Sequence, residues 1–167
     1  MSRTWKVGIL TVSDRGAAGE REDRSGPALR ETLADGPYRV ACYEVVPDEP
    51  GRISEALCRW ADREALDLVL TTGGTGVAPR DVTPEATRAV IDREVPGMAE
   101  AMRWASLQKT PHAMISRALV GIRGRTLIVN LPGSPRAARE NLEALLPALP
   151  HAMEKIQGDP SECGSPG

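Results

Sequence analysis

The pattern of apolar and polar positions along the chain predicts strands and helices in alternation. Short apolar runs at residues 7–12, 38–46, 66–70 and 126–130 are each bounded by turn-forming residues, which is typical of buried strands. Between two of these runs, apolar residues recur at helical spacing: Ile53, Ala56, Leu57, Trp60 and Ala61. Alternation of this kind predicts an α/β fold with a mostly parallel central sheet and helices on both faces.

Capping residues and prolines place the helix boundaries. Thr83 is expected to cap a helix that has Pro84 at its first position and continues to about Ile91. Ser134 and Pro135 repeat this arrangement at the start of the final helix. The other expected features are helices over residues 27–34 and 98–107, and an interruption of the final helix at Pro147 and Pro150.

Length and composition indicate one ordinary globular domain. The chain has 167 residues, of which 41% are hydrophobic and 26% charged, and its net charge is −2. This charge gives no overall attraction to nucleic acid or to an anionic membrane, so neither is expected as a partner. The first apolar run is too short for a signal peptide or a membrane span, and the three cysteines form no C-x-x-C pair. A cytoplasmic protein is therefore expected.

The most informative segment follows the apolar run at residues 66–70. It reads TTGGTG over residues 71–76, and Arg80 and Asp81 come shortly afterwards. Three glycines within four residues allow positive φ angles and bring bare N–H groups close to a ligand such as a phosphate. A tight turn that merely needs glycine is the simpler alternative. Neither a P-loop nor a dinucleotide-binding fingerprint is present in the chain.

Several other strands also end in polar loops. They lie at residues 13–16, 47–50 and 130–135, and in an open α/β sheet such loops meet the 72–81 segment at one edge. Asp14 could be a turn residue or a ligand contact, and Asp48 could simply form its turn. Glycine amides, carboxylates and an arginine gathered together suit a magnesium-bound nucleotide better than a hydrolase, because no G-x-S-x-G motif occurs.

The sequence leaves the roles of three further features undecided. Residues 17–26 are polar and charged, and a solvated loop is favoured over a mobile flap covering the site. Met98 and Trp104 on the helix over residues 98–107 are expected to pack in the core or against another subunit. His112 and His151 receive no role, because no partner spacing supports a metal site.

Seven segments of the chain carry a resemblance to a known family, and the match as a whole runs from about residue 5 to 157. They are Ser13-Asp14, Pro47–Glu49, Thr71–Gly76, Arg80–Ala86, Pro96–Arg103, Ser116-Arg117 and Asn130–Pro135. The sequence resembles the MogA/MoaB family of molybdopterin adenylyltransferases. The order TTGGTG, RDVTPEA and NLPGSP is the most specific part of this resemblance.

The resemblance implies a three-layer α/β/α sandwich that usually assembles as a homotrimer. It implies a single molybdopterin-binding domain over residues 1–157, and residues 158–167 are expected to form a flexible tail. The implied reaction belongs to molybdenum cofactor biosynthesis and adenylylates molybdopterin with MgATP, which releases pyrophosphate. Mg²⁺ is the implied cofactor, ATP and molybdopterin are the implied substrates, and other proteins of the pathway are further candidate partners.

Site residues follow from the same resemblance, position by position. Asp48 and Asp81 match the family's two essential acids, and both are expected to hold Mg²⁺, with Asp81 as the main ligand. Arg117 or Arg15 is expected to bind a substrate phosphate. The implied nucleotide- and substrate-binding residues are Ser13, Asp14, Thr72, Gly73, Gly74, Thr75, Gly76, Ser116, Arg117, Asn130, Leu131, Pro132, Gly133 and Ser134.

Two other functions compete with the adenylyltransferase. A MoaB-like protein of the same fold could bind or carry molybdopterin without catalysis. An unrelated phosphate-binding enzyme could use the same glycine-rich loop. Adenylyl transfer is nevertheless compatible with the residues, because attack on an already anionic phosphate depends on positioning and electrostatic stabilisation.

Overall fold

The computed structural model describes residues 2–164, and within them six strands form one sheet in the order β2-β1-β3-β6-β5-β4. The strands are β1 (Trp5–Val12), β2 (Tyr38–Val46), β3 (Leu68–Thr72), β4 (Arg93–Glu94), β5 (Val120–Arg123) and β6 (Thr126–Leu131). Strands β2, β1, β3 and β6 pair in parallel, whereas β5 pairs antiparallel with both β6 and β4. The predicted mostly parallel sheet is confirmed.

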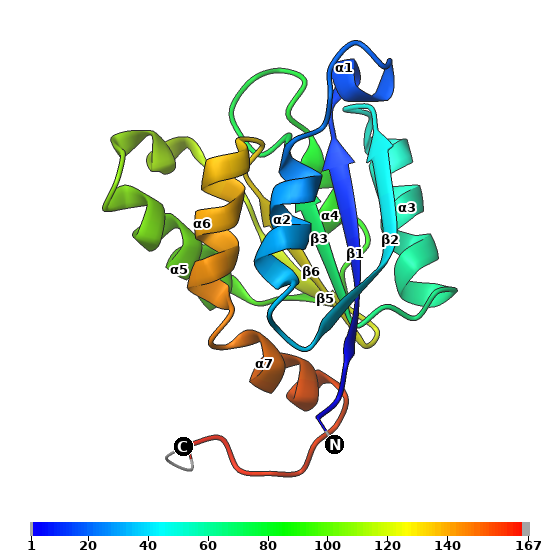
Figure 1. The fold of residues 1–167 in the computed structure, drawn as a ribbon, viewed down its shortest axis with the longest axis vertical. Coiled ribbons are helices and arrows are strands. Elements are labelled where there is room, and N and C mark those ends of the chain that lie inside the picture. Colours follow the sequence, from blue (N-terminus) through cyan, green and yellow to red (C-terminus); the bar gives the residue numbers. More distant parts are fainter. Residues whose placement is uncertain (1, 165–167) are drawn as a thin grey trace.

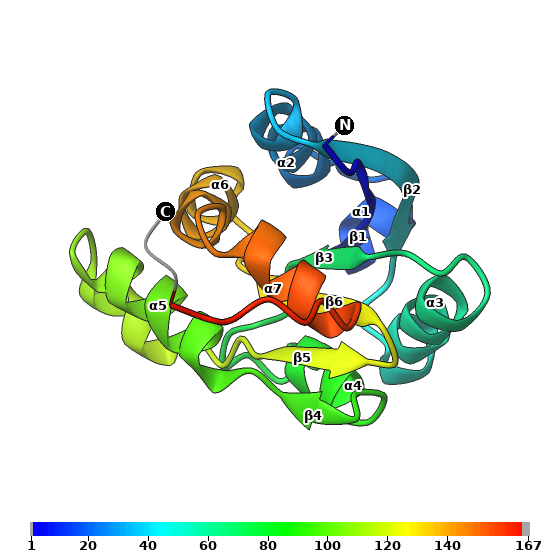
Figure 2. The same cartoon turned by 90° about the horizontal axis from the view of Figure 1, so that it is seen from below.

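Helices cover both faces of this sheet (Figures 1 and 2). Helices α2 (Ser25–Leu33), α5 (Pro96–Leu107), α6 (Pro135–Leu145) and α7 (Leu149–Ile156) lie on one side, and α3 (Pro50–Asp62) and α4 (Thr83–Arg88) lie on the other. The short helix α1 (Asp14–Ala17) follows β1, and the 3₁₀ helix η1 (Pro111–Ile115) follows α5. The three-layer α/β/α sandwich is therefore confirmed.

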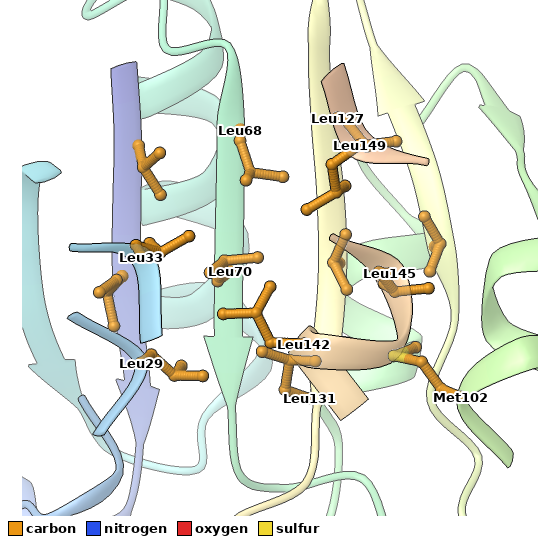
Figure 3. Close-up of a cluster of buried hydrophobic side chains, with 14 of the residues drawn as sticks. Leu29, Leu33, Leu68, Leu70, Met102, Leu127, Leu131, Leu142, Leu145 and Leu149 are labelled. Carbon is orange, nitrogen blue, oxygen red and sulfur yellow. The ribbon is translucent and has the colours of Figure 1, made fainter. Parts of the chain in front are cut away.

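Each helical layer has its own apolar core. On one face, Leu29 of α2, Met102 of α5 and Leu142 of α6 pack against Leu70 and Leu131 of the sheet (Figure 3). On the other face, the predicted stripe of α3 contacts the opposite side of the sheet, with Ile53, Ala56, Leu57 and Trp60 all buried. Side chains alternate across a strand, so β3 buries Leu68 and Leu70 on the first face and Val69 on the second.

The predicted run at residues 66–70 is shifted by two positions. Strand β3 covers Leu68–Thr72, because Thr71 and Thr72 continue the parallel pairing, opposite Asn130 and Leu131 of β6. The two threonines therefore belong to the strand and the loop begins at Gly73. A second difference follows β1, where the polar turn predicted at residues 13–16 is replaced by the helix α1, capped by the Ser13 side chain.

The helix after the central loop is shorter than predicted. It ends at Arg88 and does not reach Ile91, and Arg93–Glu94 then forms β4, a strand that the sequence pattern did not show. The reason is pairing with β5: the Asp92 N–H donates to the Ile122 carbonyl at 2.7 Å, and the Val95 N–H donates to the Val120 carbonyl at 2.8 Å. These tertiary hydrogen bonds outweigh the local helical preference.

The last part of the chain follows the expected pattern. Ser134 caps α6 by accepting a hydrogen bond from the Ala137 N–H, and Pro135 occupies the first turn. Helix α6 ends at Leu145 and α7 begins at Leu149, which confirms the interruption predicted at Pro147 and Pro150. The tail expected over residues 158–167 extends beyond the described residues and stays a prediction, as does the single-domain boundary at residue 157.

Candidate functional site

The loops that follow β1, β2, β3 and β6 enclose a cavity of about 840 Å³ at the carboxyl edge of the parallel strands. This is the edge at which open α/β sheets bind ligands. The start of α2 and the segment before it close one side. The lining residues are Thr11, Val12, Ser13, Gly16, Arg21, Glu22, Asp23, Arg24, Ser25, Asp48, Thr72, Gly73, Gly74, Asp81, Gly133, Ser134 and Pro135.

The floor of the cavity is the turn Gly73-Gly74, which no other residue type fits. Gly73 has φ +104° and a Cβ atom there would overlap the Val12 carbonyl oxygen. Gly74 has φ +68°, and its Cβ would overlap the Thr83 hydroxyl and lie 3.2 Å from Asp48 Oδ1. Positive φ and close contact together explain the glycine pair. The chain thus brings bare backbone next to an acidic side chain, as the sequence predicted.

Thr83 has a different role from the predicted helix cap. Val82 occupies the capping position of α4, and the Thr83 hydroxyl donates to the Gly73 carbonyl at 2.9 Å. The Thr83 N–H also donates to the Gly74 carbonyl at 3.1 Å. Thr83 is fully buried, and these two hydrogen bonds attach the first residue of α4 to the Gly73-Gly74 turn.

Asp48 and Asp14 hold each other in place through their backbones. The Asp14 N–H donates to Asp48 Oδ2 and the Asp48 N–H donates to Asp14 Oδ1, both at 2.9 Å. Arg80 then binds the Asp14 carboxylate with two nitrogens, at 3.0 and 2.8 Å. The loops after β1, β2 and β3 are joined in this way, and Asp48 lines the cavity.

The two carboxyl groups of this pair have opposite pKa shifts. The hydrogen bond from Arg80, followed by that from the Asp48 N–H, lowers the pKa of Asp14. Burial raises the pKa of Asp48, and the neighbouring charges of Asp14 and Asp81 raise it further, against the hydrogen bond from the Asp14 N–H. Burial and the two neighbouring acids raise the pKa of Asp48 more than Arg80 lowers it, so the site favours a further cation such as a metal ion.

Asp81 is the second acid on the cavity wall. Its Oδ2 accepts a hydrogen bond from the Ala78 N–H at 3.0 Å, and a Cβ on Gly76 would lie 2.9 Å from the same oxygen. Two carboxylates facing one cavity fit Mg²⁺, which takes oxygen ligands and keeps several waters. No cluster of three or more metal-binding side chains occurs within residues 2–164, so water and substrate oxygens would complete the coordination.

The structure gathers about half of the predicted site residues around the cavity. Ser13, Asp48, Thr72, Gly73, Gly74, Asp81, Gly133 and Ser134 line it. Asp14 does not line the cavity, but its N–H donates a hydrogen bond to the Asp48 carboxylate. Ser116 and Arg117 line a separate, smaller cavity with the start of α5, and Thr75, Gly76, Asn130, Leu131 and Pro132 lie outside the lining of the larger one.

Arg117 braces the acid-bearing loop in this structure. Its Nε donates to the Gly76 carbonyl at 2.7 Å and its Nη2 to the Asp81 carbonyl at 2.8 Å. Nη1 pairs with the Glu85 carboxylate, whose pKa it lowers. Every nitrogen of the Arg117 guanidinium thus contacts a protein acceptor in this structure. Its predicted role in binding a phosphate remains a prediction. Arg15, the other predicted cation, is exposed on α1 and does not line the cavity.

Asn130 is a structural residue of the sheet. It is fully buried, and its amide nitrogen donates to the Thr71 and Thr87 hydroxyls at 3.1 and 2.9 Å. Its side-chain oxygen accepts from the Leu119 N–H at 3.3 Å. The side chain ties β6 to β3, α4 and the segment before β5, and it orients the loop that continues to Gly133 at the cavity.

Asn130→Ala is expected to lower the free energy of unfolding by about 2–4 kcal/mol, because it leaves buried partners unpaired and opens a void. Asn141→Ala is the matched control: Asn141 is also buried but makes one side-chain bond, to Ser106, and should cost less. Urea unfolding measures both. An Asn130→Ala protein of unchanged stability that no longer binds ATP would show that Asn130 is a ligand contact.

Residues 21–25 belong to the segment for which a solvated loop was favoured over a flap covering the site, and they line the cavity. This stretch follows α1, has the composition of a solvated loop, and contributes five consecutive residues to the cavity wall. Asp23 holds it there, because its carboxylate accepts from the Thr11 hydroxyl at 2.8 Å and from the Ser25 N–H at 3.0 Å. An acid two residues before Ser25-Gly26-Pro27 at a helix start is the one local signal for this arrangement.

Fold and cavity together define an α/β protein whose ligand site lies at the carboxyl edge of a mostly parallel sheet. Residues 8–151 match the family described as a probable molybdopterin binding domain. The chain belongs to this family, and the resemblance to the MogA/MoaB proteins is confirmed. Within residues 2–164, no helix is long and apolar enough to cross a membrane.

Relatives and solved structures agree on this family. A protein of Helicobacter pylori strain J99 named molybdopterin adenylyltransferase is 45% identical over 160 residues, covering 94% of this chain and 90% of the relative. The Escherichia coli K12 protein of the same name is 45% identical over 145 residues, covering 85% and 74%. The crystal structure of the molybdopterin biosynthesis enzyme MoaB of Thermus thermophilus is 62% identical, with a TM-score of 0.89 and coverage of 95% and 100%.

Proposed function

We propose that this protein transfers the adenylyl group of MgATP to molybdopterin in molybdenum cofactor biosynthesis. The observation that carries the proposal is the placement of Asp48 and Asp81 on one cavity beside the Gly73-Gly74 turn. Relatives that are 45% identical over most of the chain are named for this reaction. The free cysteines Cys42, Cys58 and Cys163 fit a reducing compartment, so the cytoplasm is the proposed location.

In this reaction a terminal phosphate oxygen of molybdopterin attacks the α-phosphorus of ATP. A new P–O bond forms, the bond between the α-phosphorus and its bridge to the β-phosphate breaks, and pyrophosphate leaves. Both reacting groups are anionic, so the protein must bring them together against their repulsion. The cavity supplies this positioning through loops that are joined by hydrogen bonds: Asp14 with Asp48, Thr83 with Gly73, and Ser25 with the Gly133 carbonyl at 2.6 Å.

Asp48 and Asp81 would hold Mg²⁺ in this cavity. The ion, when bound, neutralises charge on the phosphate oxygens and on the leaving pyrophosphate. Without a cation, Asp48, Asp81 and a triphosphate would repel one another. The pKa of Asp48 is raised mainly by burial and further by the charges of Asp14 and Asp81. The Gly73 N–H already donates to the Leu131 carbonyl, so the Gly74 N–H, which has no partner within residues 2–164, is the proposed backbone donor to a phosphate oxygen.

Purified protein supplied with molybdopterin and MgATP should release pyrophosphate and form adenylyl-molybdopterin in equal amounts. The assay follows pyrophosphate with a coupled phosphate detector and the pterin product by chromatography. Omission of molybdopterin is the control, and should abolish release. Tight binding of molybdopterin with no consumption of ATP would contradict the proposal and would indicate a MoaB-like binding or carrier protein.

A homotrimer is the proposed assembly, and an exposed apolar surface on α5 and η1 supports it. Trp104 is 69% exposed and Met114 73% exposed, with Leu107 and Ile115 beside them in the sequence. An apolar surface of this kind is typical of a subunit interface. Of the two alternatives predicted for Trp104, packing in the core is wrong, because the buried residues of α5 are Ala99 and Met102.

Trp104→Glu combined with Met114→Glu should convert the trimer into monomers, because charge buried at an apolar interface without a partner is unfavourable. Sedimentation equilibrium should then report a mass of 17.9 kDa in place of three times that value. Ala34→Glu, which adds one negative charge at the exposed end of α2, should leave the trimer intact. Wild-type protein that sediments as a monomer would contradict the assembly.

A further inference from the structure

Two exposed arginines lie on the cavity wall, on either side of Glu22 and Asp23 in the sequence. Arg21 and Arg24 both line the cavity, on the segment between α1 and α2. Within residues 2–164, neither guanidinium makes a hydrogen bond or an ion pair. Both side chains belong to exposed residues, so they reach the cavity from its solvent side. They face a space whose other walls carry Asp48 and Asp81.

Two of the other arginines near this edge already have partners, and Arg15, whose side chain makes no hydrogen bond or ion pair within residues 2–164, lies on α1 outside the cavity lining. Arg80 is bound by both carboxylate oxygens of Asp14, at 3.0 and 2.8 Å. Arg117 contacts two carbonyl groups and the Glu85 carboxylate. A polyanionic substrate in the cavity would therefore find its available guanidinium donors on Arg21 and Arg24. Guanidinium groups bind phosphate oxygens with charge-assisted, often bidentate hydrogen bonds.

Asp23 fixes the short segment that carries both arginines. Its Oδ2 accepts from the Thr11 hydroxyl at 2.8 Å and from the Tyr43 phenol, which attaches the segment to β1 and β2. Its Oδ1 accepts from the N–H groups of Ser25 and Gly26 at 3.0 and 3.2 Å. The carboxylate therefore connects the segment to two strands and to the first turn of α2.

The neighbours of Asp23 make this attachment specific. A Cβ on Gly26 would lie 2.5 Å from both Asp23 Oδ2 and a ring carbon of Tyr43, so only glycine fits beside the carboxylate. Burial, and then the hydrogen bond to Asp23, raises the pKa of Tyr43 to about 12, which keeps the phenol protonated as a donor. Ser25, next to Arg24, also donates to the Gly133 carbonyl at 2.6 Å and joins the segment to the loop after β6.

We propose that Arg21 and Arg24 bind the phosphate groups of the substrate, and that Asp23 is the residue that positions them. This inference rests on the proposed function for the identity of the substrates. The shared ligand chemistry is a phosphate ester or anhydride, which is present both in the triphosphate of ATP and in the terminal phosphate of molybdopterin. Residues 21–25 are accordingly a phosphate-binding wall rather than a solvated loop.

Calorimetric titration with MgATP tests the first source of phosphate. Arg21→Ala combined with Arg24→Ala should weaken MgATP binding about tenfold or more, because two charge-assisted hydrogen bonds are lost. The affinity of the double variant should also depend less on salt concentration than that of the wild type. Arg39→Ala is the matched control, because Arg39 is an exposed arginine at the opposite end of β2, and its affinity should be unchanged.

The second source of phosphate is tested by the KM for molybdopterin in the pyrophosphate-release assay. Weaker MgATP binding by the double variant in the titration would assign the arginines to the triphosphate. A raised KM for molybdopterin with normal MgATP binding would assign them to the pterin phosphate. Affinity and KM that both stay within about twofold of wild type would overturn the inference. Because the titration needs no turnover, a wild-type protein that releases no pyrophosphate would count against the proposed function alone.

The positioning role of Asp23 is tested by a double-mutant cycle. Asp23→Ala should weaken phosphate binding in the wild-type background and have no further effect once Arg21 and Arg24 are alanine. Loss of stability alone would weaken binding equally in both backgrounds. Equal losses would therefore overturn the positioning role, and urea unfolding of each variant confirms that the folded protein is being titrated.

Discussion

Asp81→Asn is expected to reduce the rate of pyrophosphate release by about a hundredfold or more. Asp81 lines the cavity together with Asp48, and the substitution removes one of the two negative charges available to hold Mg²⁺ there. Groups that stabilise charge in the transition state by electrostatics contribute about 100- to 1000-fold in comparable sites. The measurement is the initial rate with saturating molybdopterin over a range of Mg²⁺ concentrations.

The substitution should leave the fold intact. The side-chain oxygen that Asn retains can still accept the hydrogen bond from the Ala78 N–H, so the loop keeps its shape. Higher Mg²⁺ concentrations should restore part of the rate, because weaker binding is the main defect. Asp35→Asn, in the exposed turn after α2, is the control for the loss of a negative charge and should be as active as wild type. Full turnover by Asp81→Asn would contradict the metal-binding role.

Gly73→Ala is expected to have the largest effect on stability, a loss of about 3 kcal/mol or more. The positive φ of +104° is unfavourable for any residue with a Cβ atom, at about 1–2 kcal/mol. The overlap of that Cβ with the Val12 carbonyl adds the cost of moving β1 or the turn. The Gly73 N–H also donates to the Leu131 carbonyl at 3.1 Å, so displacement of the turn would weaken a strand-end hydrogen bond.

Gly19→Ala separates strain from steric overlap. Gly19 has φ +74°, but a Cβ atom on this residue would have no neighbouring atom within 4 Å, so its substitution should cost only about 1 kcal/mol. Urea unfolding of both variants gives the two free energies, and MgATP binding should be lost only in Gly73→Ala. Equal destabilisation of the two variants would contradict the close packing of Gly73 against β1.

The fold was predictable from the sequence because its strands and helices bury their apolar residues in regular patterns. Strand β2 has the predicted bounds, and four of the five residues of the α3 stripe are buried, with Ala61 half-buried. The helix and strand boundaries that were predicted wrongly depend on contacts with residues far away in the sequence. Thr83 has a capping residue's side chain, but its hydroxyl is drawn to the Gly73 carbonyl. Strand β4 is two residues long and exists through pairing with β5, which no local pattern encodes.

The candidate site was predictable where chemistry follows directly from residue type. Glycines at positive φ and acids at strand ends indicated Gly73, Gly74, Asp48 and Asp81, and the structure brings these four together. A motif residue need not face the cavity, however. Asn130 belongs to NLPGSP, yet its side-chain amide already donates hydrogen bonds to Thr71 and Thr87 in the interior of the protein.

The sequence favoured a solvated loop for the segment that contains residues 21–25, and did not single out its arginines. Its composition resembles that of any solvated loop, and its place depends on the contacts of Asp23 with Thr11 and Tyr43, on two separate strands. Side-chain hydrogen bonds over this sequence distance cannot be read from local pattern. Charged loops that join a strand end to a helix start are therefore candidates for ligand-binding segments.

The central claim is that strand-end loops gather amide groups and acids around the phosphates of a nucleotide. A crystal of the protein soaked with ATP and Mg²⁺ tests it most directly. Electron density for the triphosphate should lie in the cavity between Gly73-Gly74 and Gly133-Ser134, with the metal ion bonded to Asp81 or Asp48. Nucleotide density away from residues 72–81, with both carboxylates unligated, would contradict the account.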